Sequence, residues 1–460
     1  MQRHIHILGI CGTFMGALAV LAKEMGFKVT GCDQNVYPPM STYLASLGIE
    51  VHAGYDVECL AESPDLVIVG NSMKRGMAVI EKILDEAIPF ISGPEWLYQN
   101  LLKDKKVIAV SGTHGKTTTT ALIVKILDDA GLNPGFLIGG ISEDFGISSR
   151  LTDSPYFVIE ADEYDTAFFD KRSKFIHYHP DILVINNLEF DHGDIFKDIE
   201  AIYTQFHHLM RTLPSKTSVI YPIADRQIAE VLDMGCWSQK YPTGQGTTIG
   251  IRALKPDYSQ FEFIYDNTAT RINWALIGRH NAQNALHAFQ VARLLGIDDR
   301  VIQAAFANFK GVKRRLECLF ENAALAIYDD FAHHPTAVLC TLKALQARKK
   351  PRDKVIAIIE PRSNTMKSGM QAEALVSALK CADEIWFYQH PDMTWNIEDY
   401  RHEKLLVFDA LEAVVDQFQK NLNQTQTDAF CRHYVIMSNG AFGGIHQKLC
   451  KRAKRFTKAS

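Results

Sequence analysis

Eight consecutive residues, from Gly112 to Thr119, combine residue types that can grip phosphate. They read Gly-Thr-His-Gly-Lys-Thr-Thr-Thr and follow the apolar stretch from Val107 to Val110. Small residues let successive backbone N–H groups converge on phosphate oxygens, Lys116 adds a mobile cation, and Thr117 can offer a hydroxyl to Mg²⁺. We therefore expect ATP to be bound by Gly112, Thr113, His114, Gly115, Lys116, Thr117 and Thr118.

This loop is a variant of the standard Walker pattern. The standard pattern has a further glycine five residues before Gly115, where this chain has Val110. A glycine-rich turn with an incidental lysine is the alternative interpretation. The apolar helix that begins with Lys-Thr-Thr-Thr favours phosphate binding, because the positive end of its dipole points at the loop.

Acidic residues follow two apolar strands and could hold a metal ion beside this loop. The strand Tyr156 to Glu160 runs into Ala-Asp-Glu-Tyr-Asp, and the strand Asp181 to Asn186 leads to Asp191-His192. Mg²⁺ prefers one or two carboxylates together with phosphate oxygens, so we expect Glu160 to be a ligand beside Thr117. We expect His192 to meet a second metal ion or the transferring phosphate. The alternatives are a solvated acidic loop and a structural histidine.

A second glycine-rich turn, Gly9-x-x-Gly12-x-x-x-Gly16, lies near the start of the chain, and Asp33 follows it. This is the dinucleotide-binding arrangement with a shifted spacing, and a tight turn needed only for packing is the alternative. Asn71 and Ser72 follow the strand Leu66 to Gly70, at the strand end where ligands of open sheets collect. We expect a nucleotide diphosphate to contact Gly9, Cys11, Gly12, Thr13, Gly16, Asp33, Asn71 and Ser72.

Length and composition limit the class of partner. A chain of 460 residues is expected to form about three domains of roughly 150 residues each. The net charge is −4 with both signs interspersed, so we expect neither nucleic acid nor an anionic membrane as partner, but small molecules. The nine cysteines are scattered without a C-x-x-C pair, which suits a reducing, cytoplasmic location and neither disulfides nor a zinc module.

The elements that must position these residues alternate between strand and helix. The almost uncharged segment Ile5 to Ala22 is interrupted by three glycines, so we expect a β-α-β unit there and neither a signal peptide nor a membrane span. The same alternation continues along the chain and indicates parallel α/β sheets. Polar links near residues 106 and 313 predict domains at 1–106, 107–313 and 314–460.

Two further groups of polar residues lie in the later segments. A helix from Asn281 to Leu295 places Asn281 and Asn284 on one turn, although Asn281 could simply be the N-cap of that helix. Adjacent His333 and His334 are expected on a strand, where they would point to opposite faces and could not share a metal ion.

Taken together, these motifs resemble those of the Mur ligases of peptidoglycan synthesis, in the same order and over essentially the whole chain. The resemblance implies three α/β domains: a Rossmann-like UDP-binding domain, a central P-loop ATPase domain and a C-terminal Rossmann-like domain. It implies ATP and Mg²⁺ as cofactors, with Lys116, Glu160 and His192 as catalytic residues. It also implies that Asn281 and Asn284 face adenine, and that Arg315 and Asp330 close over the nucleotide.

The resemblance further implies that an amine is joined to the carboxylate of UDP-N-acetylmuramate through an acyl phosphate. Several members of the family carry a carbamylated lysine fifteen residues after the histidine of the Asp-His pair, where this chain has His207. The departure resembles the branch that acts on UDP-N-acetylmuramate directly. The motifs at residues 9–16, 360–366 and 438–444 resemble members that add the tripeptide L-alanyl-γ-D-glutamyl-meso-diaminopimelate in peptidoglycan recycling. Addition of L-alanine is the alternative, and a non-catalytic, nucleotide-gated binding protein is an alternative from another class.

The tripeptide interpretation depends on five residues of the third segment. Arg362, Ser363 and Asn364 follow the strand Lys354 to Ile359, and Ser438 and Asn439 follow the strand Tyr434 to Met437. A guanidinium at such a strand end can bind a peptide carboxylate through two N–H groups, and the nearby glycines allow close approach of an extended chain. The alternative is that Arg362 pairs with a neighbouring acidic side chain.

Overall fold

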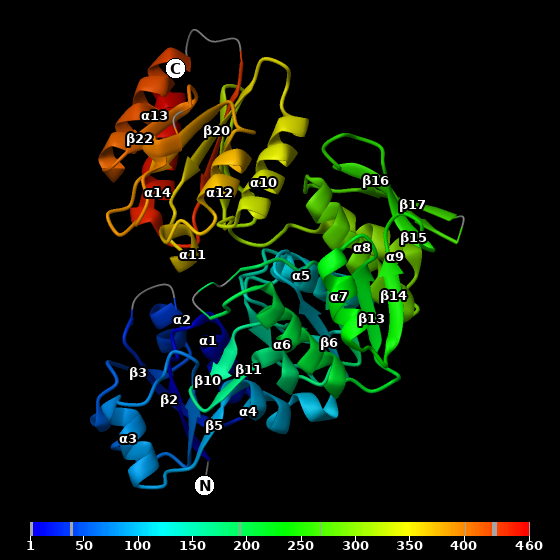
Figure 1. The fold of residues 1–460 in the computed structure, drawn as a ribbon, viewed down its shortest axis with the longest axis vertical. Coiled ribbons are helices and arrows are strands. Elements are labelled where there is room, and N and C mark those ends of the chain that lie inside the picture. The colour runs from blue at the N-terminus through cyan, green and yellow to red at the C-terminus, as the bar shows by residue number, and fades with distance from the viewer. Residues whose placement is uncertain are drawn as a thin grey trace. The chain divides into compact units, whose positions relative to one another are not determined.

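Figure 1 shows the protein as a computed structural model that describes residues 3–36, 40–191, 193, 195–266, 268–400, 402–425 and 430–459. The chain forms two compact units. Unit 1 comprises Met1–Glu189, Asp198–Gly250 and Ala285–Phe306, and unit 2 comprises Phe190–Lys197, Ile251–Asn284 and Ala307–Ser460. The boundaries fall inside or beside β15 (Ile249–Ala253), α8 (Arg279–Leu294) and α9 (Asp299–Asn308).

The first sheet of unit 1 is parallel, and its strand order is that of a Rossmann-like fold. The order is β3 (Glu50–Ala53), β2 (Lys28–Asp33), β1 (His4–Leu8), β4 (Leu66–Val69) and β5 (Phe90–Ser92). Every residue of β1 is buried, as expected for a parallel sheet covered on both faces. The helical elements are α1 (Thr13–Glu24), α2 (Met40–Ser46), η1 (Val57–Leu60), α3 (Ala78–Asp85), α4 (Gly93–Asn100) and η2 (Leu102–Asp104). The β-α-β unit expected at the start of the chain is confirmed by β1, α1 and β2.

The second sheet of unit 1 has seven strands and is parallel except for its last pair. The order is β14 (Gln239–Thr243), β13 (Ser218–Pro222), β12 (Ile182–Ile185), β6 (Lys106–Ser111), β9 (Tyr156–Glu160), β7 (Gly135–Leu137) and β8 (Ser149–Arg150). Because β6 pairs with both β12 and β9, the loop after β6 lies between the carboxyl ends of those two strands. This is where ligands of open α/β sheets bind.

Shorter elements complete unit 1. The hairpin of β10 (Asp165–Ala167) and β11 (Asp170–Ser173) follows β9 and leads into η3 (Lys174–His177). The remaining helices are α5 (Lys116–Asp129), α6 (Ile199–Thr212) and α7 (Arg226–Met234), together with most of α8 and α9.

Unit 2 contains a six-stranded sheet with helices on both faces. The order is β18 (Glu317–Glu321), β19 (Leu325–Asp330), β23 (Arg432–Met437), β20 (Lys354–Ile359), β21 (Glu384–Tyr388) and β22 (Leu405–Phe408), and only the β18–β19 pair is antiparallel. In Figure 1, α10 (Pro335–Arg348) and α12 (Ala372–Leu379) cover one face, and α13 (Leu411–Thr425) and α14 (Ile445–Ala459) cover the other. Alternate residues of β20 enter the two cores: Val355, Ala357 and Ile359 enter one, and Ile356 and Ile358 the other.

The other elements of unit 2 are a small sheet and short helices. The small sheet has the order β15, β16 (Gln260–Tyr265) and β17 (Thr268–Asn273), and β16 and β17 are antiparallel. The short helices are α11 (Asn364–Lys367), η4 (Ile397–Tyr400) and η5 (Phe442–Gly444). No helix among the described residues is long and apolar enough to cross a membrane.

The strand placement of His333 and His334 was wrong. β19 ends at Asp330, where the chain turns because Phe331 N donates to Arg314 O at 2.8 Å. His334 is instead the N-cap of α10, and its Nδ1 accepts a hydrogen bond from Thr336 N at 3.3 Å. Pro335 at the first helical position fixes this start.

Candidate functional site

The phosphate-type loop connects β6 to α5 and requires glycine at its first position. Gly112 has φ +116°, and a Cβ there would lie 2.7 Å from Asn187 O. Thr113 N donates to Asn187 O at 3.1 Å, and His114 N donates to Asn187 Oδ1 at 2.8 Å. The start of the loop is therefore bonded to Asn187, in the segment that follows β12. The N–H groups of Thr113 and His114 already donate hydrogen bonds to Asn187. We therefore expect the backbone contacts to phosphate to come from the later residues of the loop and the first turn of α5.

Lys116 begins α5, and its ammonium lies among the carboxylates at the end of β9. Nζ donates to Gly112 O at 2.8 Å and to Glu163 Oε2 at 2.7 Å, and it lies 3.5 Å from Asp162 Oδ1. Burial opposes the charge, but these carboxylates outweigh it and raise the pKa of Lys116 above its usual range. The side chain is therefore a permanent cation held at the loop.

The residues expected to bind Mg²⁺ within unit 1 do come together. Thr117 Oγ1 donates to Glu160 Oε1 at 3.2 Å, and Glu160 Oε2 accepts from Gly139 N at 2.7 Å. A Cβ on Gly139 would lie 2.6 Å from Glu160 Oε1, so glycine is needed for this contact. Hydroxyl and carboxylate oxygens are donors that suit Mg²⁺. His192, the third expected ligand, lies outside the described residues.

A buried network behind the loop was missed by the sequence interpretation. His287 of α8 places Nδ1 2.9 Å from Asn186 Oδ1 and Nε2 3.1 Å from Thr243 Oγ1. An amide oxygen only accepts, so the ring proton is assigned to Nδ1 and Nε2 accepts from the threonine hydroxyl. Asn186 Nδ2 in turn donates to His114 O at 3.2 Å. Burial lowers the pKa of His287 to about 3, so this network is built on a neutral ring. No local pattern reveals it, because its bonded members are 44 to 101 positions apart in the sequence.

The glycine turn between β1 and α1 is shaped by the end of β2. Gly9 has φ +81° and its N–H donates to Cys32 O at 2.8 Å, and Cys11 N donates to Asp33 Oδ2 at 2.9 Å. The other oxygen of Asp33 accepts from Asn35 N at 3.0 Å. Asp33 thus holds the turn in place through Oδ2, while Oδ1 fixes the segment that follows β2.

Close packing explains the other glycines of this turn and brings β4 to it. A Cβ on Gly16 would lie 2.7 Å from Met40 Sδ, and a Cβ on Gly9 would lie 3.5 Å from Ser72 Oγ. The end of β4, which carries Asn71 and Ser72, therefore lies beside the turn. Gly12 and Thr13 are exposed, and burial, together with Asp33, raises the pKa of the Cys11 thiol to about 11.

The five peptide-site residues lie at the ends of two adjacent strands of unit 2. β20 and β23 pair in parallel register, with Ile359 opposite Met437. Ser438 Oγ donates to Glu360 Oε2 at 2.5 Å, and Gly440 N donates to Ser438 Oγ at 2.9 Å. Ser363 caps α11 by accepting from Met366 N, which orients Asn364 in the first turn. Within the described residues, the buried Oδ1 of Asn439 makes no hydrogen bond.

Arg362 packs against the glycine turn after β23. A Cβ on Gly440 would lie 2.1 Å from Arg362 Cδ, so only glycine lets the side chain pass. The Arg362 side chain is 49% exposed, and its Nη1 lies 3.8 Å from Glu360 Oε1, a longer contact than a hydrogen bond. The same turn is held by Arg314, whose Nη2 donates to Ser438 O at 2.6 Å and to Gly440 O at 2.8 Å. Arg314 and the buried Glu360 are site residues that sequence reasoning left unassigned.

The remaining expected nucleotide residues lie in unit 2. α8 begins at Arg279, so Asn281 is inside the first turn and the N-cap alternative was wrong. Its Nδ2 donates to Ile277 O at 2.8 Å, and Asn284 lies one turn further along the helix. Burial raises the pKa of Asp330 to about 6, against the opposing effect of its bond from Ala332 N. Arg315 lies over the Phe331 ring, 4.9 Å from its centroid.

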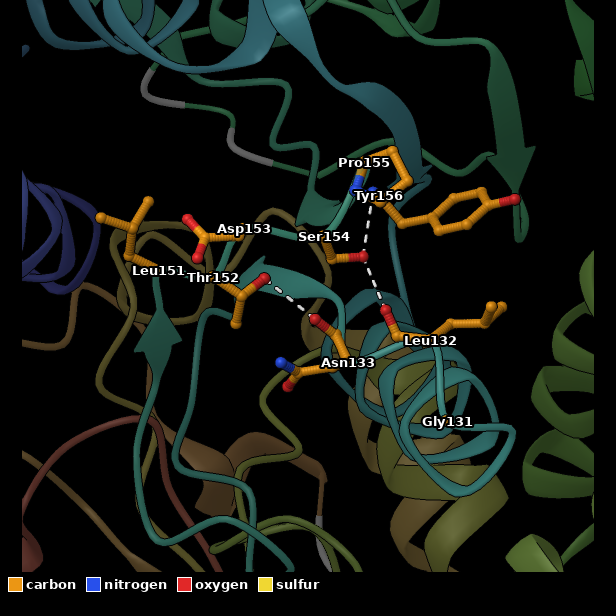
Figure 2. Close-up of a pocket in the computed structure, with 9 residues that line it drawn as sticks. All are labelled: Gly131, Leu132, Asn133, Leu151, Thr152, Asp153, Ser154, Pro155 and Tyr156. Carbon is orange, nitrogen blue, oxygen red and sulfur yellow. Dashed lines mark hydrogen bonds between the residues drawn. The ribbon is translucent and has the colours of Figure 1, made fainter.

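Figure 2 shows a pocket that contains none of these residues. It lies at the amino end of β9, the opposite end of the strand from Glu160. Two of its hydroxyls bond to neighbouring backbone: Ser154 Oγ donates to Leu132 O at 2.6 Å, and Thr152 Oγ1 donates to Asn133 O at 2.9 Å. The pocket is therefore separate from the phosphate loop.

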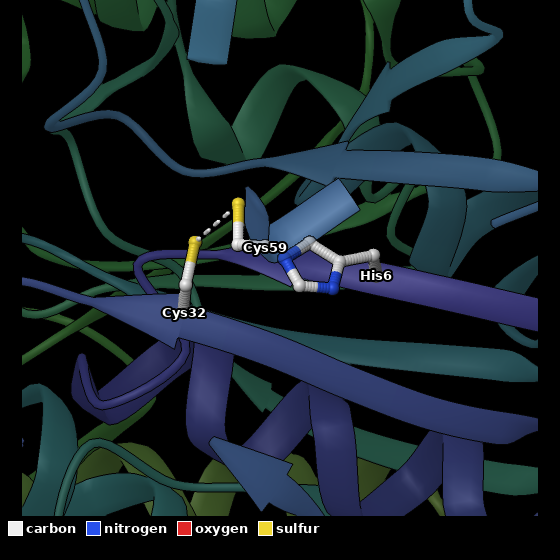
Figure 3. Close-up of side chains that lie close together, drawn as sticks. All are labelled: His6, Cys32 and Cys59. Carbon is white, nitrogen blue, oxygen red and sulfur yellow. Dashed lines mark hydrogen bonds between the residues drawn. The ribbon is translucent and has the colours of Figure 1, made fainter. Parts of the chain in front are cut away.

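Figure 3 shows two cysteines and a histidine that lie close together at the first sheet. His6 on β1, Cys32 on β2 and Cys59 in η1 place their ligand atoms within 4.8 Å of one another. Cys32 Sγ donates to Cys59 Sγ at 3.5 Å, and both side chains belong to an apolar core cluster. All nine cysteines lie within the described residues and none forms a disulfide, as expected from their spacing.

Three family models match consecutive parts of the chain. The model described as Mur ligase family, catalytic domain matches residues 4–105. The model described as Mur ligase middle domain matches residues 110–292, and the one described as Mur ligase, glutamate ligase domain matches residues 314–429.

Similar proteins cover nearly the whole chain. A UDP-N-acetylmuramate–L-alanyl-gamma-D-glutamyl-meso-2,6-diaminoheptandioate ligase of Haemophilus influenzae is 46% identical over 457 residues, 98% of this chain and 100% of the relative. A UDP-N-acetylmuramate–L-alanine ligase of Clostridium kluyveri is 32% identical over 367 residues, 79% of this chain and 78% of the relative. The crystal structure of a murein peptide ligase from Psychrobacter arcticus has a TM-score of 0.74 and 40% identity, and the match covers 98% of both chains.

Proposed function

This chain belongs to the Mur ligase family, and we propose that it joins the tripeptide L-alanyl-γ-D-glutamyl-meso-diaminopimelate to UDP-N-acetylmuramate at the expense of ATP. It is an ATP-dependent, amide-forming ligase that serves peptidoglycan recycling. The observation that carries this conclusion is the 46% identity to the Haemophilus influenzae tripeptide ligase over 98% of the chain. The L-alanine ligase matches at 32% identity over 79% of the chain, which makes L-alanine the weaker candidate for the amine.

The first chemical step activates the muramyl carboxylate. A carboxylate is a poor electrophile, so its oxygen attacks the γ-phosphorus of ATP, the bond to the ADP oxygen breaks, and an acyl phosphate forms. We assign Lys116 to the transferring phosphate, because its ammonium is a permanent cation at the loop. An ATP phosphate oxygen would take up the donor that now goes to Glu163.

We assign Mg²⁺ to the oxygens of Thr117 and Glu160, with His192 as a further ligand. Bound Mg²⁺ disperses charge on the transferring group. Gly139 supports the site by orienting the Glu160 carboxylate through its N–H. Asn281 and Asn284 are proposed to contact adenine, and Arg315 and Asp330 to contact the nucleotide.

The second step is attack of the neutral tripeptide amine on the acyl carbon, which forms the amide and expels phosphate. We assign Arg362, Ser363, Asn364, Ser438 and Asn439 to the peptide. The half-exposed side chain of Arg362 supports this role. Glu360 lies 3.8 Å from its guanidinium, which is too far for a hydrogen bond, so the N–H donors remain available for a peptide carboxylate. Asn439 is assigned to the peptide because it follows Ser438 at the end of β23, beside the end of β20.

The three-domain division at 1–106, 107–313 and 314–460 remains part of this proposal, with the sugar nucleotide assigned to the first domain, ATP to the second and the amine to the third. Gly9, Cys11, Gly12, Thr13, Gly16, Asp33, Asn71 and Ser72 are assigned to the UDP moiety, directly or by shaping its turn. The absence of disulfides among nine cysteines supports a cytoplasmic site of action.

The proposal is tested by the stoichiometry of ADP release. We expect one ADP for each amide formed, and release only when UDP-N-acetylmuramate and the tripeptide are both present. Steady ADP release from ATP alone would contradict the ligase and favour a nucleotide-gated binding protein.

A further inference from the structure

A nearly buried lysine of unit 1 lies against one ring in α1 and one ring in the segment that follows β9. Lys174 is the first residue of η3, and its side chain is 11% exposed. Its Nζ lies 5.4 Å from the centroid of the Phe14 ring and 5.4 Å from that of the Tyr164 ring. Phe14 stands in the first turn of α1, directly after the glycine turn, and Tyr164 follows the acidic segment at the end of β9. The ammonium therefore lies between the proposed diphosphate turn and the phosphate loop.

The three N–H donors of this ammonium are not used within the protein. Among the described residues, no acceptor lies within hydrogen-bonding distance of Lys174 Nζ, and its ion-pair partner, Asp162 Oδ2, is 3.8 Å away. The two aromatic faces attract the charge but accept no conventional hydrogen bond. Three unused donors on the ammonium of a side chain that is only 11% exposed point to an anionic ligand.

The same carboxylate links Lys174 to the catalytic lysine. Asp162 Oδ1 lies 3.5 Å from Lys116 Nζ, and Oδ2 lies 3.8 Å from Lys174 Nζ. The hairpin that precedes Lys174 is fixed to this segment, because Ser173 Oγ donates to Glu163 O at 2.5 Å and Lys174 N donates to Tyr164 O at 2.9 Å. The segment after β9 that contacts the Lys116 ammonium therefore also positions the Lys174 ammonium.

We propose that Lys174 binds the carboxylate of the sugar nucleotide, the group that is phosphorylated. The inference rests on the proposed function, in which the diphosphate is held at the glycine turn and the carboxylate must reach the γ-phosphate at Lys116. Two anions repel each other as they approach, and a cation between their sites offsets that repulsion. Lys174 transfers no proton: the carboxylate oxygen bonds to phosphorus, ADP leaves with the electron pair, and the ammonium donates to the carboxyl oxygens throughout.

Two sugar nucleotides separate this role from a structural one. UDP-N-acetylglucosamine has the same uridine diphosphate and hexose as UDP-N-acetylmuramate but lacks the lactyl carboxylate. We would measure the Kd of both by calorimetry for wild type, Lys174→Met and Lys174→Arg. Lys171→Met is the matched control, since Lys171 lies on the hairpin that precedes Lys174 and its side chain is 67% exposed.

For Lys174→Met we expect the affinity for UDP-N-acetylmuramate to fall about tenfold or more, as for loss of a charge-assisted hydrogen bond, with the affinity for UDP-N-acetylglucosamine unchanged. Lys174→Arg should keep most of the preference for the carboxylate, and Lys171→Met should keep all of it. Equal weakening of both ligands, or no weakening of either, would overturn the inference, and retained UDP-N-acetylglucosamine binding shows that the variant is folded. If wild type itself bound both ligands equally, the proposed function would fail first, and this inference with it.

Discussion

The buried ring of His287 gives unit 1 a pH dependence of stability whose size follows from the structure. Burial lowers the pKa of this ring from 6.5 to about 3 in the folded protein. The unfolded chain binds a proton below about pH 6.5 and the folded chain does not, so stability is lost as the pH falls through that value. Between about pH 7.5 and about pH 5 the loss amounts to about 2 kcal/mol, and this result depends little on the exact pKa of the folded state.

The substitution His287→Asn removes the titrating group. It should cost about 1–3 kcal/mol at about pH 7.5, because the ring's bonds to Asn186 and Thr243 are lost. At about pH 5 the wild type has lost its additional 2 kcal/mol or so while the variant has not, so the gap between the two proteins should shrink by that amount. Because Asn186 supports the phosphate loop through His114 O, the variant should also raise the KM for ATP.

Urea unfolding of the full chain at both pH values measures the gap, taken from the transition that reports unit 1. His52→Asn is the control, since it removes an imidazole whose side chain is 43% exposed and which lies outside the buried network. A gap of the same size at both pH values would refute the reasoning, because it would mean that His287 takes up its proton equally in the folded and unfolded chains.

Four further substitutions test the assigned site residues. Lys116→Ala should lower the rate of ligation by about a hundredfold or more while calorimetry finds UDP-N-acetylmuramate binding nearly intact; a variant with half of wild-type turnover would remove Lys116 from the phosphate site. Glu160→Gln and His192→Ala should each raise the Mg²⁺ concentration needed for half-maximal ADP release, and an unchanged titration in both would place the metal ligands elsewhere. Arg362→Ala should raise the KM for the tripeptide and leave that for UDP-N-acetylmuramate unchanged; an unaltered peptide KM would mean that the guanidinium serves only Glu360.

The parallel sheets could be predicted from the sequence because their signals are local. Buried runs such as Val107 to Val110 and Val355 to Ile359 are continuous, and each is followed by small or polar residues at the strand end. The glycine turns after β1 and β6 also carry a local signal, because Gly9, Gly112 and Gly115 each have a positive φ. The candidate functional residues that follow these strands could therefore be identified without knowledge of tertiary contacts.

Other features depend on pairings that no window of sequence contains. The short strands of the β10–β11 hairpin and of the β15–β16–β17 sheet are only partly buried, so they lack a continuous apolar run. His287 meets Asn186 across 101 positions, and Lys174 lies over a ring 160 positions earlier in the chain, so neither role was visible. The wrong prediction that His333 and His334 lie on a strand has a similar origin. β19 ends at Asp330, and the next residue, Phe331, donates its N–H to Arg314 O, a contact that the sequence does not reveal.

The choice of amine is the central claim, and a comparison of kcat/KM for two amine substrates tests it most directly. With ATP and UDP-N-acetylmuramate saturating, kcat/KM is measured from ADP release for the tripeptide and for L-alanine. The account predicts that the tripeptide is preferred by orders of magnitude, because Arg362 and the turn after β23 present more binding surface than a single amino acid can use. An equal or higher kcat/KM for L-alanine would contradict it and would make the chain an L-alanine ligase.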